Sequence, residues 1–461
     1  MGRFPINEIS KTLGFKILII VILGLLLLIP MGFINSVVRD RIRYQKEAVS
    51  SIIEPVGDSA DIQGIVAAIP YMTRVIDSET KEIKYVRKYI FYMPNEYNVE
   101  GDIEVSSLSR GIFKAPIFNS QLKITGRFDK YNAEIYNLDE NNNTILYDEA
   151  MIIIGIGNKK NLMKLPIVLL NDNEELKYYE KNINISLNMF NNKFLYTISK
   201  DKILNGFDFN ITMDIQGGNS LIITPLASEN SFKISSKWKD PSFTGGFLPT
   251  KREVNNEGFN AEWNIASFNT SFTKYWTSDE NVNTANNINS DSYSYSDESI
   301  INNSSNNVLI SFLLLNDNYQ RISRSVKYAI LFIFIPFFVL FLCEVLSKKR
   351  IHPVQYILIG IANAIFYLLL LAISEHIHFN LSYFISALMV TALTSIYIGY
   401  IIKSPKYTVS MAVVEALIYI FLFGILQLTD YALLMGTLGL FAVIALAMYF
   451  TRNVDWYGEN S

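Results

Sequence analysis

Two apolar stretches enclose a long polar middle in this chain. Residues 17–34 form an unbroken apolar run, and residues 328–450 are apolar almost throughout, whereas roughly 290 residues of ordinary polar sequence lie between them. A helix over residues 17–34 is about 27 Å long at ~1.5 Å per residue, close to the ~30 Å hydrocarbon core of a bilayer. The pattern predicts an integral membrane protein with a large soluble domain between its membrane segments.

The first apolar run has two interpretations, an uncleaved anchor and a cleaved signal peptide. The run is longer than the ~7–15 apolar residues typical of a signal peptide. Residues 35–39, which follow it, offer no cleavage site with small residues. We therefore expect residues 17–34 to form a transmembrane anchor that follows a cytoplasmic segment, residues 1–16.

The second apolar stretch predicts five transmembrane helices, at about residues 327–346, 353–373, 381–402, 408–427 and 431–450. Basic residues occupy alternate loops between them. These residues are Lys348, Lys349, Arg350, Lys403 and Lys406, with Arg452 after the last span, whereas loops 374–380 and 428–430 contain no Lys or Arg. Short basic loops stay in the cytoplasm. We therefore predict a cytoplasmic tail at 451–461, a cytoplasmic N-terminus, and residues 35–326 outside the cytoplasm.

The polar middle is rich in strand signals. Short β-branched and aromatic runs are separated by Asn, Gly and Pro, at 65–69, 84–92, 151–154, 184–187, 208–215 and 221–224. Gly217, Gly218 and Asn219 predict a hairpin turn between the last two runs. No helical periodicity of useful length occurs between residues 60 and 275. The predicted fold class is a membrane protein of α+β type: an anchor helix, a β-rich, sandwich-like antiparallel extracytoplasmic domain, and a five-helix bundle.

Composition narrows this prediction further. Residues 280–307 are rich in Asn, Ser, Asp and Tyr, which predicts a flexible insert or long loop. The net charge of −3 gives no basic footprint, so we expect no nucleic-acid partner. Cys343 is the single cysteine, which excludes a disulfide within the chain. The β-rich domain must therefore be held together by its own core.

Several motifs, in order along the chain, resemble the CreD family of bacterial inner-membrane proteins. The most specific is a Ser-x-Trp-x-x-Pro-Ser-Phe-x-Gly block that contains Trp238, Pro241, Ser242 and Phe243. Further similar segments lie at 251–263, 324–331, 352–356, 366–370, 374–376, 430–434 and 451–457. The early block departs from the family pattern at 64–70, and the insert at 280–307 looks peculiar to this chain. The resemblance implies a role in cell envelope integrity, with links to two-component regulation and colicin tolerance, but no reaction.

Candidate chemistry is sparse. The sequence contains no zinc-protease, nucleophile-elbow, Walker or paired-cysteine motif, and we expect no cofactor and no metal site. Glu375 and His376, near His378, form the densest polar cluster. Such a cluster could bind a metal or relay protons, but the lack of a third or fourth ligand favours a solvated polar cap on a helix end.

Two acidic residues fall within predicted spans. Glu415 is either a proton or ion site or a neutral acid hydrogen-bonded between helices. The family resemblance supplies no acid there, which favours the second interpretation. Glu344 lies four residues before Lys348, which predicts an interfacial ion pair. Asn363, at the middle of a span, is expected to join two helices.

These observations leave three classes of function. The first is a non-enzymatic envelope protein in the lipid bilayer whose outer domain binds an unknown envelope partner or senses envelope state. The second is a component of a transport system that needs a partner ATPase, an analogy of architecture alone. The third, a hydrolase, rests only on scattered polar residues.

Overall fold

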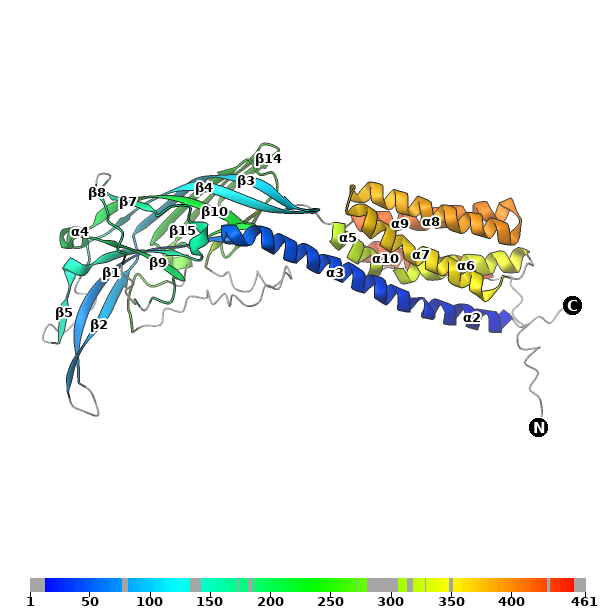
Figure 1. Ribbon diagram of the computed structural model, residues 1–461, viewed down its shortest axis with the longest axis horizontal. Coiled ribbons are helices and arrows are strands. Elements are labelled where there is room, and N and C mark those ends of the chain that lie inside the picture. Colours follow the sequence, from blue (N-terminus) through cyan, green and yellow to red (C-terminus); the bar gives the residue numbers. More distant parts are fainter. Residues whose placement is uncertain are drawn as a thin grey trace. The chain divides into compact units, whose positions relative to one another are not determined.

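The protein divides into two compact units, residues 1–46 with 316–461 and residues 47–315. The computed structural model (Figure 1) describes residues 13–76, 82–132, 142–171, 174–180, 185, 187–270, 272–279, 306–312, 318–327, 329–347, 351–428 and 432–451. The first unit is helical and the second is built mainly from strands. This combination confirms the predicted fold class.

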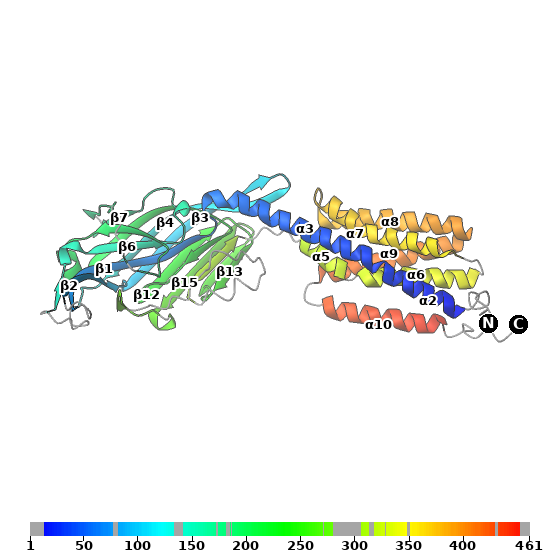
Figure 2. The ribbon, with the colours of Figure 1, turned by 60° about the horizontal axis from the view of Figure 1, so that its bottom comes forward.

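The helices of the first unit run alongside one another in both ribbon views (Figure 2). They are α2 (Leu13–Leu26), α3 (Leu28–Ile53), α5 (Asn318–Lys327), α6 (Ala329–Ser347), α7 (Pro353–Ser374), α8 (Phe379–Ile402), α9 (Pro405–Gln427) and α10 (Ala432–Thr451). Within the described residues, four helices are long and apolar enough to cross a membrane: Leu18–Val56, Pro353–Ser374, Phe379–Ile402 and Pro405–Gln427. A shorter apolar helix covers Phe334–Glu344.

The N-terminal helix continues well beyond the apolar run that predicted it. Helix α3 ends at Ile53, and a 3-10 turn, η1 (Glu54–Val56), follows it. The polar sequence after residue 34 contains no Gly or Pro before Pro55, so nothing interrupts the helical hydrogen bonds. Gly57 then adopts a left-handed conformation with φ of 90°, which ends the helical segment.

Helix α7 begins with a reciprocal cap that explains one of the family-like motifs. The Nδ1 atom of His352 accepts a hydrogen bond from the amide of Val354 at 3.3 Å. The Oε1 atom of Gln355 accepts one from the amide of His352 at 2.9 Å. Pro353 occupies the first helical turn, where its missing N–H costs nothing. These residues therefore fix where the helix starts.

Two sheets form the second unit. In the residues described, the first sheet has nine strands: β13 (Pro241–Gly245), β17 (Val308–Phe312), β11 (Ser220–Ile223), β1 (Ala60–Ile76), β2 (Ile83–Tyr92), β16 (Tyr275–Thr277), β5 (Asn143–Ile145), β6 (Met151–Ile156) and β9 (Asn192–Thr197). The second has eight: β14 (Lys251–Asn255), β15 (Gly258–Ala266), β12 (Glu229–Ser236), β3 (Glu96–Arg110), β4 (Phe113–Phe128), β10 (Phe207–Gly218), β7 (Ile167–Leu170) and β8 (Glu174–Glu175). A short helix, α4 (Lys200–Asn205), and the 3-10 turns η3 (Tyr147–Glu149), η4 (Lys159–Asn161) and η5 (Ser267–Asn269) complete the described elements.

The main core lies between the two sheets. One continuous cluster combines Ile65 and Ile154 of the first sheet with Leu122, Phe232 and Trp263 of the second, all nearly inaccessible to solvent. A smaller cluster covers the opposite face of β1 and β6. Because the middle of β1 is buried on both faces, residues 65–71 of this strand are continuously apolar instead of alternating. The unit is therefore a sandwich with an extra apolar layer.

The predicted hairpin at residues 217–219 is wrong. Strand β10 pairs with β4 as far as Gly218 and belongs to the second sheet. Strand β11 begins at Ser220 and lies in the first sheet, between β1 and β17. Asn219, at φ of 54°, makes the turn that carries the chain from one sheet to the other. The sequence correctly indicated a turn. The two strands cannot form a hairpin with each other because β10 pairs with β4 and β11 pairs with β1 and β17, all distant in the sequence.

Pairing also differs from the expected antiparallel pattern in two places. Strand β1 runs parallel to β11, and β12 runs parallel to β3. Of the predicted strand at 184–187, residues 185 and 187 lie outside any strand, and 184 and 186 are not among the described residues. The proposed insert at 280–307 falls almost wholly outside the described residues as well.

Candidate functional site

The Trp238 segment joins the two sheets. The indole Nε1 of Trp238 donates a hydrogen bond to the carbonyl of Asp240 at 3.2 Å. Pro241, Ser242 and Phe243 then open β13, which pairs with β17 at the edge of the first sheet. The chain thus leaves β12 of one sheet and enters the other within this motif.

Phe243 anchors this crossing in the core. Its ring lies edge-on to the rings of Phe259, at 5.4 Å between centroids, and of Trp263, at 5.7 Å. The indole Nε1 of Trp263 donates to the carbonyl of Phe247 at 3.2 Å. These contacts give the family-like residues of this block a role in closing one end of the sandwich.

Glu375 joins three helices of the first unit. It caps the C-terminus of α7, and its Oε1 accepts a hydrogen bond from the hydroxyl of Tyr319 in α5 at 3.1 Å. The same oxygen lies 3.5 Å from Nε of Arg41 in α3. Burial, and then the neighbouring Glu375 carboxylate, raise the pKa of Tyr319 well above its usual range, so this phenol remains a donor.

His376 takes no part in this contact. Both His376 and His378 are exposed, and the part of the chain that the structure describes contains no group of three or more His, Cys, Asp or Glu side chains suited to a metal ion. The structure therefore separates the two candidates of this motif: Glu375 is a structural tie, and His376 lies at the surface.

Glu415 is almost fully buried at the middle of α9. Its Oε2 accepts a hydrogen bond from the hydroxyl of Thr394 in α8. One turn along α9, the hydroxyl of Tyr419 donates to Oδ1 of Asn363 in α7 at 3.3 Å, and the backbone carbonyl of Tyr419 accepts from the hydroxyl of Tyr383 at 2.7 Å. Three helices thus share one buried polar cluster.

The sequence identified Glu415 and Asn363 but missed Thr394 and Tyr383. A signal was present, because α8 carries hydroxyl side chains through an otherwise apolar span. Such residues mark the faces along which transmembrane helices contact one another. Which helix they meet is a property of the packed bundle.

Glu344 is also buried, and the structure describes one of its contacts. Its Oε2 accepts a hydrogen bond from the hydroxyl of Tyr356 in α7 at 3.0 Å. Lys348, the expected partner, lies outside the described residues. Since Tyr356 belongs to the 352–356 motif, this hydrogen bond explains a second feature of that motif.

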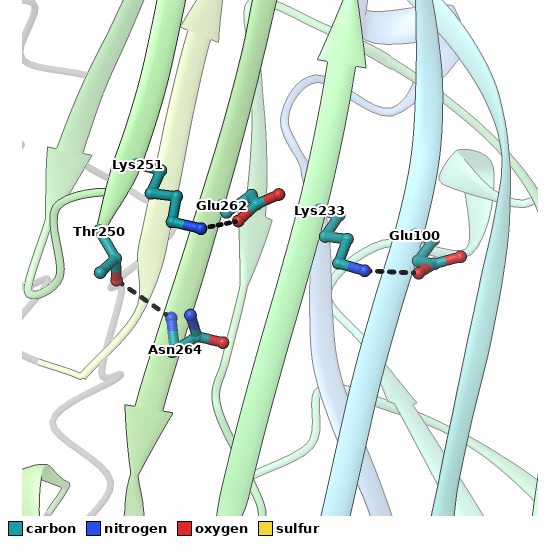
Figure 3. A network of polar contacts seen from close by, with 6 residues as sticks. All are labelled: Glu100, Lys233, Thr250, Lys251, Glu262 and Asn264. Atoms are coloured by element: carbon teal, nitrogen blue, oxygen red, sulfur yellow. Dashed lines mark hydrogen bonds and ion pairs between the residues drawn. The ribbon is translucent and has the colours of Figure 1, made fainter.

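The outer face of the second sheet carries a row of alternating charges (Figure 3), which the sequence analysis missed. Figure 3 shows Lys251, Glu262, Lys233 and Glu100 on neighbouring strands. Lys123 of β4 pairs with Glu100 and extends the row to a fifth strand. The Lys251 and Glu262 side chains approach to 3.7 Å, and those of Lys233 and Glu100 to 3.4 Å. Charges at every second position of a strand are visible in the sequence and indicate an exposed face. The order of the strands, which brings these charges into one row, is not visible there.

A shallow cavity of about 680 Å³ lies on this charged face. Strands β3, β12, β14 and β15 form it, with Asp102, Ser235 and Asn260 beside the charged row. Its lining combines charged and polar side chains with the apolar Ile234 and Ala261. The carboxylates of Glu100, Asp102 and Glu253 are exposed there. The cavity therefore presents charged groups of both signs to its surroundings.

Comparison with known proteins covers nearly the whole chain. The family model described as "Inner membrane protein CreD" matches residues 12–457. The protein of that name from Escherichia coli strain K12 is 29% identical over 447 residues, which span 94% of this chain and 91% of that protein. The match includes both structural units.

Proposed function

Because the chain belongs to the CreD family of inner membrane proteins, we propose that it maintains the integrity of the cell envelope through a partner bound to its β-rich unit. The family and the apolar helices support a multi-pass protein of the inner membrane. In this proposal the helices anchor the protein, and the β-rich unit lies outside the cytoplasm.

The basic loops support this orientation. Lys and Arg in short loops resist translocation, so loop 348–350 and the tail after residue 451 stay inside. Alkaline phosphatase fused after Ala227 should be active, and fusions after Lys349 and Tyr457 should give the cytoplasmic pattern. Reversed activity at the first two sites refutes the orientation. Disagreement at Tyr457 alone would mean that one predicted span does not cross.

The observation that carries the partner-binding proposal is the charged face of the second sheet. Exposed ion pairs add only ~0–1 kcal/mol to stability, so the row at Lys233 and its neighbours contributes little to holding the fold together. Alternating charges do specify a complementary polar surface and suppress wrong partners. The favoured partner is therefore an envelope component with charges of both signs, which docks over the cavity.

Site-specific photo-crosslinking in cells tests this proposal. A benzoylphenylalanine at Asn260, within the cavity, should give a defined adduct, whereas one at Phe268, which is 87% exposed but outside the cavity, should not. Deleting the gene should also increase sensitivity to detergent. Equal adducts at both positions, or unchanged detergent sensitivity, would contradict the proposal.

A transport role is the second candidate. The buried polar cluster around Glu415 favours it, because intramembrane acids often lie on ion or substrate pathways. Such a role requires a partner ATPase. Purification from membranes under mild conditions should recover that ATPase, and repeated failure to do so would remove this candidate.

A further inference from the structure

The polar cluster of the bundle lies halfway along its helices. Glu415 is the eleventh residue of α9 (Pro405–Gln427), and Asn363 is the eleventh of α7 (Pro353–Ser374). Glu415 is 1% exposed and Asn363 is 4% exposed. Glu415 is therefore within one residue of the middle of its helix.

The carboxyl group has one firm partner and one open position. Thr394 donates to Oε2, and the amide of Asn363 also approaches the carboxyl group. Neither Oε1 of Glu415 nor Nδ2 of Asn363, however, has a hydrogen-bond partner among the described residues. A buried polar atom without a partner is costly, so these two atoms are the ones whose bonding must change with the charge of Glu415.

Asn363 suits either charge state of this carboxyl group. An amide side chain both donates and accepts, and its Oδ1, which already accepts from Tyr419, has a second lone pair. Against a carboxylate, Asn363 can donate from Nδ2 to Oε1. Against a carboxylic acid, it can accept from the Oε1 hydroxyl. A hydrocarbon neighbour would support neither state.

No cation neutralises Glu415 in the described bundle. Apart from Glu415, the titratable side chains close to Tyr419 are Tyr367 of α7 and Tyr383 of α8. Helix α10 presents Tyr449, which is exposed. Lys403 caps the C-terminus of α8, and Lys406 and Tyr407 lie in the first turn of α9. These groups are therefore about half the length of a helix away from Glu415.

The charged side chains of the remaining neighbouring helices make no described hydrogen bond or ion pair with Glu415, although Nε of Arg324 in α5 is buried without a described partner. In α6, Glu344 accepts from Tyr356, and Cys343 is the residue beside it. In α5, Arg321 lies over the ring of Phe379. Arg324 and Lys327 complete the charges of α5, and the described interactions do not join Arg324 to Glu415. A proton is therefore the simplest group that can neutralise this acid.

We propose that Glu415 is a reversible proton-binding site inside the bundle, with Thr394 and Asn363 as the residues that position it in both charge states. The carboxylate takes one proton from water to become the acid and returns it to water, with no other bond made or broken. The hydrogen bond across α8 and α9 then changes strength with proton occupancy, which couples protonation to the packing of the two helices.

Infrared spectroscopy of the full-length protein in phospholipid vesicles tests this proposal. A protonated carboxyl group gives a carbonyl stretching band apart from the amide bands, and buried glutamates can titrate at up to about pH 8–9. The wild type should show a band that disappears as the pH rises. Glu415→Gln should lose this band, whereas Glu344→Gln, which changes another buried acid of the bundle, should keep it.

Two further variants retain the carboxyl group and keep the test decisive if Glu415→Gln misfolds. Thr394→Val removes one hydrogen bond and should shift the band to higher frequency. Asn363→Leu removes the donor to the charged form and should move the midpoint of the titration to higher pH. A band that is independent of pH, absent throughout, or unaffected by all three variants overturns the proposal. Loss of the band on adding sodium at constant pH also overturns it, in favour of a cation site.

Discussion

Replacing Asp61 by Asn should stabilise the β-rich unit at neutral pH but not in acid. Asp61 lies in β1, where its Oδ2 accepts a hydrogen bond from Nε2 of Gln63 at 2.9 Å. A Cβ atom on Gly157 would lie only 2.8 Å from that oxygen, which shows how closely the chain packs there. Burial raises the pKa of Asp61 from 3.8 to about 6, against the smaller opposite effect of Gln63.

The sign of the effect follows from proton binding. The folded state binds the Asp61 proton more tightly than the unfolded state does. The carboxyl group therefore costs no folding stability below pH 3.8, and its cost in folding stability grows from there up to about pH 6. At ~1.36 kcal/mol per pKa unit, the full penalty is about 3 kcal/mol. This is an upper value, because Asp61 as a whole is partly exposed. Asn keeps the size and removes the charge.

Tryptophan fluorescence during urea unfolding of the full-length protein in detergent can measure this difference. Trp238, Trp263 and Trp276, three of the four tryptophans of the chain, belong to the β-rich unit, so most of the signal reports on that unit. Asp61→Asn should raise the free energy of unfolding by about 1–3 kcal/mol at pH 7 and change it little near pH 4. Asp201→Asn, at an exposed position, is the matched control. An equal gain at both pH values, or none at pH 7, would refute the reasoning.

Two other substitutions test contacts in each unit. Glu375→Gln should destabilise the helical unit by about 1–3 kcal/mol because the Tyr319 hydroxyl loses its carboxylate acceptor. His376→Ala, at the exposed neighbouring position, should have little effect. Thermal unfolding in detergent measures both variants, and equal losses of stability would contradict the structural role of Glu375. Gly245→Ala should destabilise the β-rich unit more than Gly111→Ala. Both glycines have a positive φ, but only at Gly245 would a Cβ atom lie 2.5 Å from the backbone oxygen of Asn307. Equal losses in urea unfolding would show that backbone conformation alone sets the cost.

The sequence determined the class of protein because a bilayer imposes a simple rule. Every backbone polar group in hydrocarbon must be satisfied within its own helix, so a span needs about twenty apolar residues. Each apolar run, at 17–34 and 328–450, therefore predicts helices without reference to the rest of the chain, and the structure has helices in both. The sequence also contained the motifs that identify the family.

Tertiary structure decided which elements meet. Gly217 and Gly218 indicated a turn in the sequence. The turn connects two sheets because β10 pairs with β4, whereas β11 pairs with β1 and β17. The alternating charges from Lys251 to Lys123 align only because five particular strands are neighbours.

The same division applies inside the bundle. An acid within an apolar span is visible in the sequence because burying it is expensive, and Glu415 was identified on that ground. Its partner Thr394 is 21 residues away on another helix. No local pattern fixes that distance in space, because it depends on how α8 and α9 rotate and slide as their apolar faces pack. The sequence alone thus located the buried acid, and packing chose the groups that surround it.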